Sequence, residues 1–407
     1  MNKTTLRNYA KLIARKGVNI QKGQEVIIRA ELDQPEFVTV LVQECYKAGA
    51  SFVSVEWSHQ PLTKINTRYR SQKMLNRITD WELEKLKNQA KVLPCMIHLT
   101  SSDPDGLKGV RQDKLIKASK AKYPTIKPIR DSMDNKYQWC IAGVPGKAWA
   151  KKVFPQLTPA AAVKALWEAI ISTSRAESDP MAAWDKHNAD LKAKYTYLNA
   201  LGIDKLHYKA SNGTDFTVGL NPEGEFHGGG DTSLQGVYFN PNIPSEEIFT
   251  SPMKGVAEGI VYSTKPLSYN GELIENFSVR FEGGRAVEVK AEKGQKLLEE
   301  MISMDEGAAY LGEVALVSYD SPINQSGILF YNTLYDENAC CHLAFGAGFN
   351  ECLKGFESLS NEECKKKGIN ESMIHVDFMI GSRDLEIEAI TRDNRRVKIF
   401  ENGTWAF

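Results

Sequence analysis

The stretch EVIIRA, residues Glu25–Ala30, and the two segments that follow it decide the class of the fold. A short apolar run between polar residues predicts a strand buried in a sheet. The next segment predicts a helix, because Asp33 is a suitable N-cap, Pro35 stands in the first turn and Gly49 follows the last turn. Residues Ser51–Trp57 predict a second strand. Strand, helix and strand in this order predict a parallel pair joined by a crossover.

The same alternation of strands and helices continues to residue 190. The patterns predict helices around 72–90, after Pro104 and from Thr158-Pro159, with strands at Val92–Leu99 and Tyr137–Ala142. Residues 1–190 are therefore expected to form an α/β domain with parallel strands. This region has neither a GxGxxG nor a P-loop sequence, so no nucleotide site is predicted.

Predicted strands dominate the rest of the chain. They lie at Lys205–Ala210, Asp215–Leu220, Val256–Tyr262, Phe277–Glu282, Ala286–Lys290, Glu313–Tyr319, His375–Ile380 and Asp384–Ile390. We expect residues 191–407 to form a largely antiparallel α+β domain. Two domains agree with the length of 407 residues, which exceeds what one hydrophobic core usually organises.

Composition and charge argue against several classes of function. The chain is 42% hydrophobic and 25% charged, which is typical of a globular protein in water. Lys plus Arg and Asp plus Glu each total 51, so the charge balance predicts neither a nucleic-acid partner nor an anionic membrane. No apolar run reaches the roughly 20 residues that cross a bilayer, and residues 1–7 do not begin a signal peptide. The seven cysteines form no CxxC pair, which predicts reduced thiols in a cytoplasmic protein.

A second stretch, YNTLYDENACCH at residues 331–342, places a carboxylate and an imidazole five residues apart, at Glu337 and His342. This spacing cannot share one strand face, so a bend or a helix start is expected between them. His375 and Asp377 are two apart in a predicted strand, and both side chains therefore leave the same face. Four carboxylates and two histidines together suit divalent metal ions: Glu247, Glu313, Glu337, His342, His375 and Asp377. Their spacing matches no standard motif such as HExxH, so these residues alone predict a carboxylate-rich metal site and no particular reaction.

Several long segments resemble one known family. They are Asn242–Thr250, Ser321–Gly327, Phe330–His342 and His375–Gly381. Over essentially its whole length the chain resembles the aminopeptidase T family of metallo-aminopeptidases, which includes aminopeptidases S and II. The resemblance implies an N-terminal α/β domain, a C-terminal domain that carries the metals, and a cytoplasmic homodimer.

The resemblance also implies a reaction. Such enzymes remove N-terminal residues from peptides with a free N-terminus, using water activated between two divalent ions, with zinc, cobalt or manganese as the candidates. The family's ligand positions correspond to the six residues named above. Glu313 is expected either to bridge the ions or to handle the proton of the water. The substrate amine is expected to bind a metal ion or an acidic side chain, for which Glu246 is one choice.

One position departs from the family pattern. Seven residues after His342 the family has a tyrosine near the metals, whereas this chain has Phe349. A phenyl ring can neither ligate a metal nor donate a hydrogen bond. Two alternatives therefore stand beside the aminopeptidase. One is a metal-binding pseudo-enzyme with weakened or lost catalysis. The other is a dinuclear hydrolase of a different bond, such as a phosphoester, although a neutral chain without an evident Arg cluster is ill-suited to phosphate.

Overall fold

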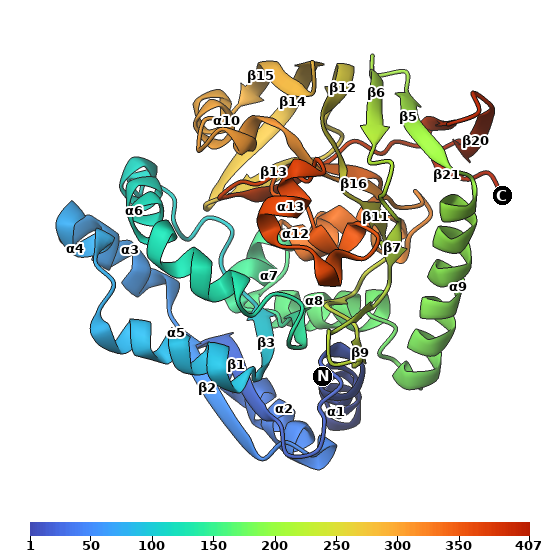
Figure 1. Cartoon of the computed structure of the whole chain (residues 1–407). Coiled ribbons are helices and arrows are strands. Elements are labelled where there is room, and N and C mark those ends of the chain that lie inside the picture. The colour runs from blue at the N-terminus through green and yellow to red at the C-terminus, as the bar shows by residue number, and fades with distance from the viewer. The chain divides into compact units, whose positions relative to one another are not determined.

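The first predicted strand lies inside a five-stranded sheet. β1 (Glu25–Glu31) pairs in parallel with β2 (Phe52–Ser58) on one side and with β3 (Cys95–Thr100) on the other. β4 (Trp139–Gly143) continues the parallel pairing beyond β3, and β10 (Asn242–Ile243) forms that edge of the sheet. The α/β arrangement with parallel strands expected for the first part of the chain is confirmed (Figure 1).

Helix α2 (Pro35–Ala48) links β1 and β2 as predicted. Gly49 ends it with a φ of 118°, a conformation that glycine adopts without the steric cost of a Cβ atom. The expectation that Asp33 caps this helix is wrong. The N-cap is Gln34, whose side chain makes no capping bond. The Asp33 carboxylate instead accepts a hydrogen bond from the Ser101 hydroxyl at 3.2 Å, so a partner supplied by the tertiary structure replaces the local one.

The other helices of this region lie close to their predicted positions. Residues around 72–90 form two helices, α4 (Gln72–Asn76) and α5 (Asp80–Val92), and the Thr158 side chain caps α8 (Pro159–Thr173). The helix expected after Pro104 begins later, because turns occupy residues 104–109 and α6 spans Gln112–Asp131. The remaining helices are α1 (Lys3–Leu12), a π-helical turn at Ile13–Gly17, α3 (Gln60–Tyr69), α7 (Lys147–Val153) and α9 (Pro180–Ala200).

The structure, a computed structural model, describes residues 1–407, and the chain forms two compact units. Unit 1 comprises Met1–His187, Gly230–Ser245 and Asn270–Glu272, and unit 2 comprises Asn188–Gly229, Glu246–Tyr269 and Leu273–Phe407. The later segments of unit 1 contain β10 and the short pair β8 (Asp231–Thr232) and β9 (Tyr238–Phe239). No sequence pattern marked their place in unit 1. The division into domains at residue 190 stays a prediction.

Unit 2 is built from antiparallel strands, as expected for the second part of the chain. Its larger sheet has nine strands: β13 (Leu267–Tyr269), β14 (Glu272–Glu282), β12 (Pro252–Tyr262), β6 (Asp215–Leu220), β5 (Ile203–Lys209), β19 (Glu386–Thr391), β20 (Arg396–Glu401), β21 (Thr404–Trp405) and, beside β14, β15 (Arg285–Lys293). The smaller sheet runs in the order β18 (His375–Met379), β17 (His342–Gly346), β16 (Leu311–Leu316), β11 (Ile248–Thr250) and β7 (His227–Gly228). The helices are short: α10 (Gln295–Ile302), α11 (Pro322–Gln325), α12 (Thr333–Asp336), α13 (Asn361–Lys366), and 3-10 turns at Gly307–Ala309, Glu337–Ala339, Asn350–Cys352 and Phe356–Ser358.

One face of the smaller sheet belongs to the core of unit 2. Phe345 of β17 stacks on Phe378 of β18 with ring centroids 4.8 Å apart, and these rings also contact Phe281 and Phe277 of β14. The Phe378 side chain thus packs in the core, as the alternation along the strand predicted. The opposite face of the same strands carries Glu313, His342, His375 and Asp377 among small and apolar residues.

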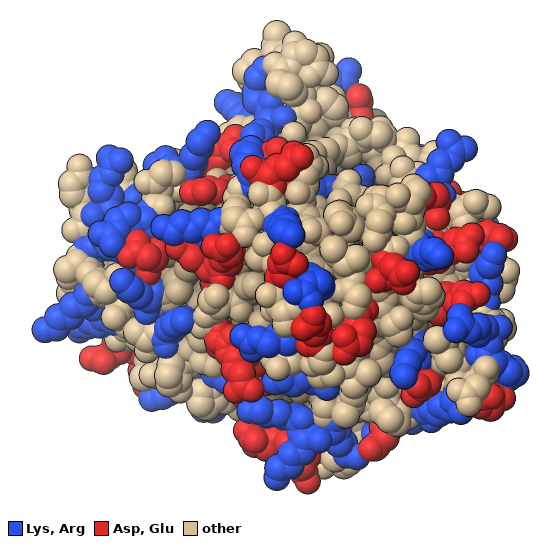
Figure 2. All heavy atoms as spheres, turned by 90° about the horizontal axis from the view of Figure 1, so that it is seen from above, with Lys and Arg blue, Asp and Glu red and all other residues tan.

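The surface and the cysteines agree with the composition. Figure 2 shows Lys and Arg side chains interspersed with Asp and Glu over the face in view, in a chain whose formal net charge is zero. All seven cysteines are buried and none is paired. No helix combines the length and the apolar character that crossing a bilayer requires.

Candidate metal centre

The register of the smaller sheet brings four of the six candidate ligands to one face. Glu313 on β16 lies opposite Ala344 on β17, which in turn lies opposite Asp377 on β18. Directly opposed residues of antiparallel strands point to the same side, so the two carboxylates share a face. His342 is two residues from Ala344, and His375 is two residues from Asp377. Both imidazoles therefore reach the same side of the sheet.

Glu247 completes this group from the neighbouring strand. It immediately precedes β11, which pairs with β16. Its Oε2 atom lies 3.2 Å from Nε2 of His342. On the other side, Nε2 of His375 lies 3.0 Å from Oε2 of Glu313 and 3.2 Å from Oδ1 of Asp377. All five side chains are thus close neighbours, although the chain separates them by up to 130 residues.

These donors form two overlapping groups of three. Glu247, Glu313 and His342 make one group, and Glu313, His375 and Asp377 make the other, with the donor atoms of each group within 4.8 Å of one another. Glu313 belongs to both groups. The arrangement therefore offers two adjacent clusters of carboxylate oxygen and imidazole nitrogen that have one carboxylate in common.

Glu337 stands beside these groups. It begins the 3-10 turn that follows α12, so a helical turn separates it from His342, as the spacing predicted. The next residue, Asn338, is fully buried and links two parts of the site. Its amide nitrogen donates to Oε1 of Glu337 at 3.3 Å, and its amide oxygen accepts the backbone N–H of Glu246 at 2.6 Å. Asn338 thus fixes Glu337 relative to the segment that carries Glu247.

Burial and like charge raise the pKa of two of the acids. Burial raises the pKa of Glu313 to about 7. The hydrogen bond from His375 opposes this shift, and the nearby carboxylates reinforce it. Burial and the charges of Asp377, Glu247 and Glu313 raise the pKa of Glu337 well above its usual value. Burial would also raise the pKa of Asp377, but the adjacent His375 has the larger effect and lowers this pKa to about 2.

The histidines show the opposite balance. Burial would lower the pKa of His342, but the Glu247 carboxylate raises it to about 9. Burial would likewise lower the pKa of His375, and Asp377 and Glu313 raise it well above its usual value. The concentrated negative charge therefore attracts positive charge to this place, whether a proton or a metal ion supplies it.

The donor atoms fit a divalent ion. Nε2 of His342 and Oδ1 of Asp377 are buried atoms that make no aligned hydrogen bond, although a neighbouring charged group is 3.2 Å from each. Nδ1 of His375 lies 2.7 Å from the carbonyl oxygen of Ala347, which can only accept, so Nδ1 carries a proton. In the neutral ring the lone pair is then on Nε2, which faces the carboxylates. A histidine held by a carbonyl in this way is a common feature of metal sites.

Phe349 lies against this group of donors. Its ring centroid is 4.8 Å from that of His375 and 5.4 Å from that of Phe249. The backbone of Phe349 is fixed by Ser251, whose hydroxyl accepts the Phe349 N–H at 2.7 Å. The phenyl ring therefore borders the site and does not point away from it.

Sequence reasoning named the five residues whose donor atoms meet here and also Glu337 beside them, but missed two supports. Asn338 lies within the quoted stretch, but its burial, which makes its hydrogen bonds important, appears only in the structure. Ser251 carried no signal, because its bond to Phe349 spans 98 residues. Together the fold and the site define a protein with a carboxylate-rich centre suited to divalent metal ions.

Comparison with known proteins assigns a family to this centre. The family described as thermophilic metalloprotease (M29) matches residues 2–405. Aminopeptidase AmpS of Bacillus subtilis (strain 168) is 43% identical and aminopeptidase 2 of Geobacillus stearothermophilus is 40% identical, each covering 99% of this chain and 98% of the relative. The structure of wild-type AmpT from Thermus thermophilus matches with a TM-score of 0.90 at 38% identity and covers 100% of both chains.

The chain therefore belongs to the M29 family of metalloproteases, and it is a metallo-aminopeptidase. This confirms the resemblance that the four sequence segments indicated. It also confirms that the protein is a hydrolase that depends on a divalent metal.

Proposed function

We propose that the protein holds two divalent ions in the two overlapping donor groups and uses them to release N-terminal residues from peptides. The observation that carries the proposal is the position of Glu313, which belongs to both groups and is 4% exposed. Glu247 and His342 would complete one site, and His375 and Asp377 the other. Glu337 would add a further carboxylate beside them.

Ions bound there would polarise the carbonyl of the first peptide bond and lower the pKa of the attacking water. The residues of the chain supply the rest of the chemistry. Glu313 would either bridge the ions or take the proton of the water and return it to the departing amine. Its raised pKa, caused first by burial, brings the carboxyl close to the range in which a proton can be taken and returned.

The two histidines and Asp377 hold the site in position. The Ala347 carbonyl fixes the ring of His375, and Asp377 reaches the same place from the same strand. His342 stands at the start of β17 opposite Ala315, so the sheet register sets its distance from Glu247. Rigid placement of this kind matters, because displacements near 1 Å lower catalytic rates strongly.

The free α-amine of a peptide would bind one ion or an acidic side chain. Glu246 is a candidate, since it directly precedes Glu247 and is half-buried, with its backbone held by Asn338. A substrate bound through its amine would present only its first peptide bond for attack. This accounts for release of single N-terminal residues.

Metal analysis coupled to activity tests the proposal. We expect two ions per chain, and hydrolysis of an aminoacyl-anilide or a dipeptide that chelator abolishes and zinc, cobalt or manganese restores. The same substrate with an acetylated amine should not be cleaved. One ion per chain in the fully active protein would refute the two-ion site. Equal cleavage of the acetylated substrate would refute the role of the amine.

The roles of Glu313 are separated by Glu313→Gln. Full metal content with lost turnover identifies Glu313 as the group that handles the proton. Loss of about one ion together with turnover identifies it as the bridge.

A second candidate function rests on Phe349. Its ring borders His375, and a phenyl ring can neither ligate a metal nor donate a hydrogen bond there. A metal-binding pseudo-enzyme would take up metal with no hydrolysis of any peptide in the same assay.

Further properties belong to the same proposal. We infer a homodimer in the cytoplasm, in keeping with the family resemblance and with seven buried, unpaired cysteines. The carboxylate-rich donor set accommodates zinc, cobalt or manganese.

A further inference from the structure

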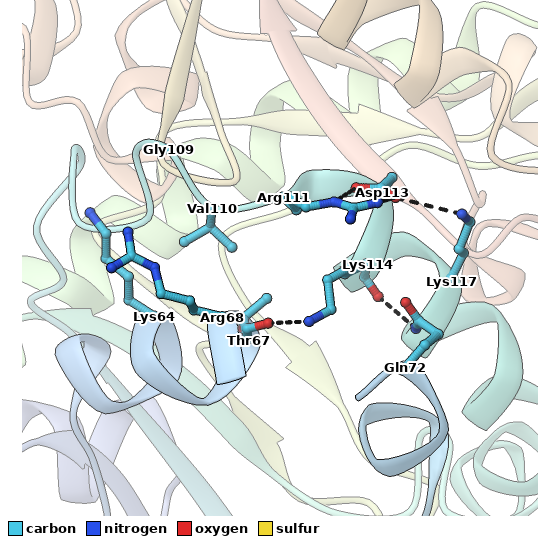
Figure 3. A pocket seen from close by; sticks show the side chains of 10 residues that line it. All are labelled: Lys64, Thr67, Arg68, Gln72, Gly109, Val110, Arg111, Asp113, Lys114 and Lys117. Carbon is cyan, nitrogen blue, oxygen red and sulfur yellow. Dashed lines mark hydrogen bonds and ion pairs between the residues drawn. The ribbon is translucent and has the colours of Figure 1, made fainter. Parts of the chain in front are cut away.

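Unit 1 contains a pocket of about 530 Å³, and half of the residues that line it are cationic. Its walls are α3, the start of α4, the turn before α6 and the first two turns of α6 (Figure 3). The charged lining consists of five cations and one carboxylate: Lys64, Arg68, Arg111, Lys114, Lys117 and Asp113. We refer to it as the basic pocket. An excess of four positive charges in one pocket stands out in a chain whose formal net charge is zero.

The single carboxylate is already shared. Nε of Arg111 donates to Oδ1 of Asp113 at 3.0 Å, and a terminal nitrogen of Arg111 donates to Oδ2 at 2.6 Å. Lys117 reaches the same carboxylate at 3.5 Å. Asp113 therefore balances at most one of these two cations.

Lys64 and Lys114 donate hydrogen bonds to uncharged partners. Nζ of Lys64 donates to the carbonyl of Lys108 at 2.7 Å. Nζ of Lys114 donates to the carbonyls of Thr67 and Arg70, at 2.5 and 2.8 Å. A carbonyl accepts a hydrogen bond but does not neutralise an ammonium. Lys64, Arg68 and Lys114 thus retain their charge beside the cavity.

Two pairs of these cations are close in sequence on one helix. Lys64 and Arg68 are four residues apart on α3, a like-charge spacing that destabilises a helix by about 0.2–0.5 kcal/mol. Lys114 lies in the first turn of α6, where the positive end of the helix dipole disfavours cations, and Lys117 follows three residues later. An anion bound between α3 and α6 would convert both repulsions into attraction.

We infer that the basic pocket binds a small organic polyanion, a molecule with two or more phosphate or carboxylate groups. The volume of about 530 Å³ lies in the range of small-molecule sites, about 300–1,000 Å³, and is much larger than a single oxyanion needs. Figure 3 shows Lys64 and Arg68 at one side of the pocket and Lys117 at the other, so separate anionic groups can be held at once. The guanidinium of Arg68 can hold two oxygens of one group. A nucleic acid fits less well, since the cations line a recess and not an extended stripe.

The inference does not rest on the proposed peptidase mechanism, and calorimetry of the metal-loaded protein tests it. The probes are fructose 1,6-bisphosphate and tricarballylate, titrated separately at about 0.1 M salt, where charges beyond about 10 Å are screened. The variant Lys64→Gln/Arg68→Gln removes two cations of the pocket. The matched control Lys87→Gln/Lys91→Gln removes two exposed lysines with the same spacing on α5 of the same unit.

We expect one probe molecule per chain, at least about tenfold weaker binding in Lys64→Gln/Arg68→Gln, and a change within about twofold in the control. Tighter binding of the bisphosphate assigns phosphate as the ligand chemistry, and tighter binding of tricarballylate assigns carboxylate. The inference is overturned if neither probe saturates the protein by about 10 mM. It is equally overturned if both double variants lose the same affinity, because general surface charge then explains the binding.

Discussion

Replacing Glu313 by glutamine should affect the metal-free and the metal-loaded protein in opposite directions. Glu313 is buried among other carboxylates, and its pKa rises from 4.5 to about 7, mainly through burial. A carboxyl group whose pKa is raised on folding makes the folded protein less stable as pH increases. The loss begins when the unfolded chain ionises near pH 4.5 and is complete above the folded pKa, about 7.

The size of the effect follows from the same shift. At about 1.4 kcal/mol for each tenfold step in acidity, the ionised Glu313 costs the metal-free protein roughly 3 kcal/mol above pH 7. Glutamine keeps the shape and carries no charge. We therefore expect metal-free Glu313→Gln to be more stable than the parent at pH 8 by up to roughly 3 kcal/mol. For a cooperative unit of about 200 residues this is an increase in Tm of about 6–12 °C.

Bound metal should reverse this order of stability between the parent and Glu313→Gln. Ions that bind only the folded protein add about 2.7 kcal/mol at one hundred times their Kd, and the variant without the Glu313 charge loses much of this gain. Thermal unfolding followed by circular dichroism, with chelator and with added zinc, measures both cases at pH 8 and pH 5. Glu357→Gln, an exposed position, is the control and should stay within about 0.5 kcal/mol. The reasoning is refuted if metal-free Glu313→Gln is no more stable than the parent at pH 8, or if its advantage is as large at pH 5.

Four other outcomes are expected. Asp377→Ala should lose bound metal and activity together with an unchanged far-ultraviolet spectrum, because Asp377 shares a strand face with His375; full metal content by elemental analysis would contradict its role as a ligand. Phe349→Tyr should raise kcat about tenfold with little change in KM, which corresponds to an activation free energy lower by about 1.4 kcal/mol. An unchanged kcat would show that no hydroxyl is needed there. Gly346→Ala should lower the free energy of unfolding by more than about 2 kcal/mol, because φ is +96° and a Cβ atom would lie 2.0 Å from the Ile374 carbonyl oxygen. Gly355→Ala is the control, since its φ is +70° but no atom stands near the added Cβ, and it should cost less. Equal losses of Tm in the two variants would contradict the steric argument. Light scattering should give twice the chain mass of 45.5 kDa, and the monomer mass at micromolar concentration would exclude the homodimer.

The elements of the fold were largely readable from local patterns. The order of β1, α2 and β2 followed from an apolar run, a proline in the first turn and a terminal glycine, and the structure confirms it. The exact ends of the helices and strands were less predictable. β12 begins at Pro252, four residues before the predicted start, because pairing with β6 across a bulge extends it beyond its local apolar pattern. Asp33 failed as a cap because Ser101, 68 residues away, provides its partner.

The sequence by itself determined which residue types are candidate ligands, and it determined one local geometry. The alternation of side chains along a strand is enough to put His375 and Asp377 on one face. The family resemblance implied which residues join them, and the structure brings Glu247, Glu313 and His342 close to this pair. Their bridging and proton-transfer roles stay a prediction.

Only the tertiary structure decided that Glu313 stands between two donor groups. That position depends on the register of β16, β17 and β18, since a slip of one residue would turn Glu313 or Asp377 to the opposite face. Register is set by contacts between distant segments, such as the stacking of Phe345 on Phe378, and no local pattern specifies it. The basic pocket arises in the same way, because Lys64 and Lys114 become neighbours of one cavity only when α3 and α6 come together.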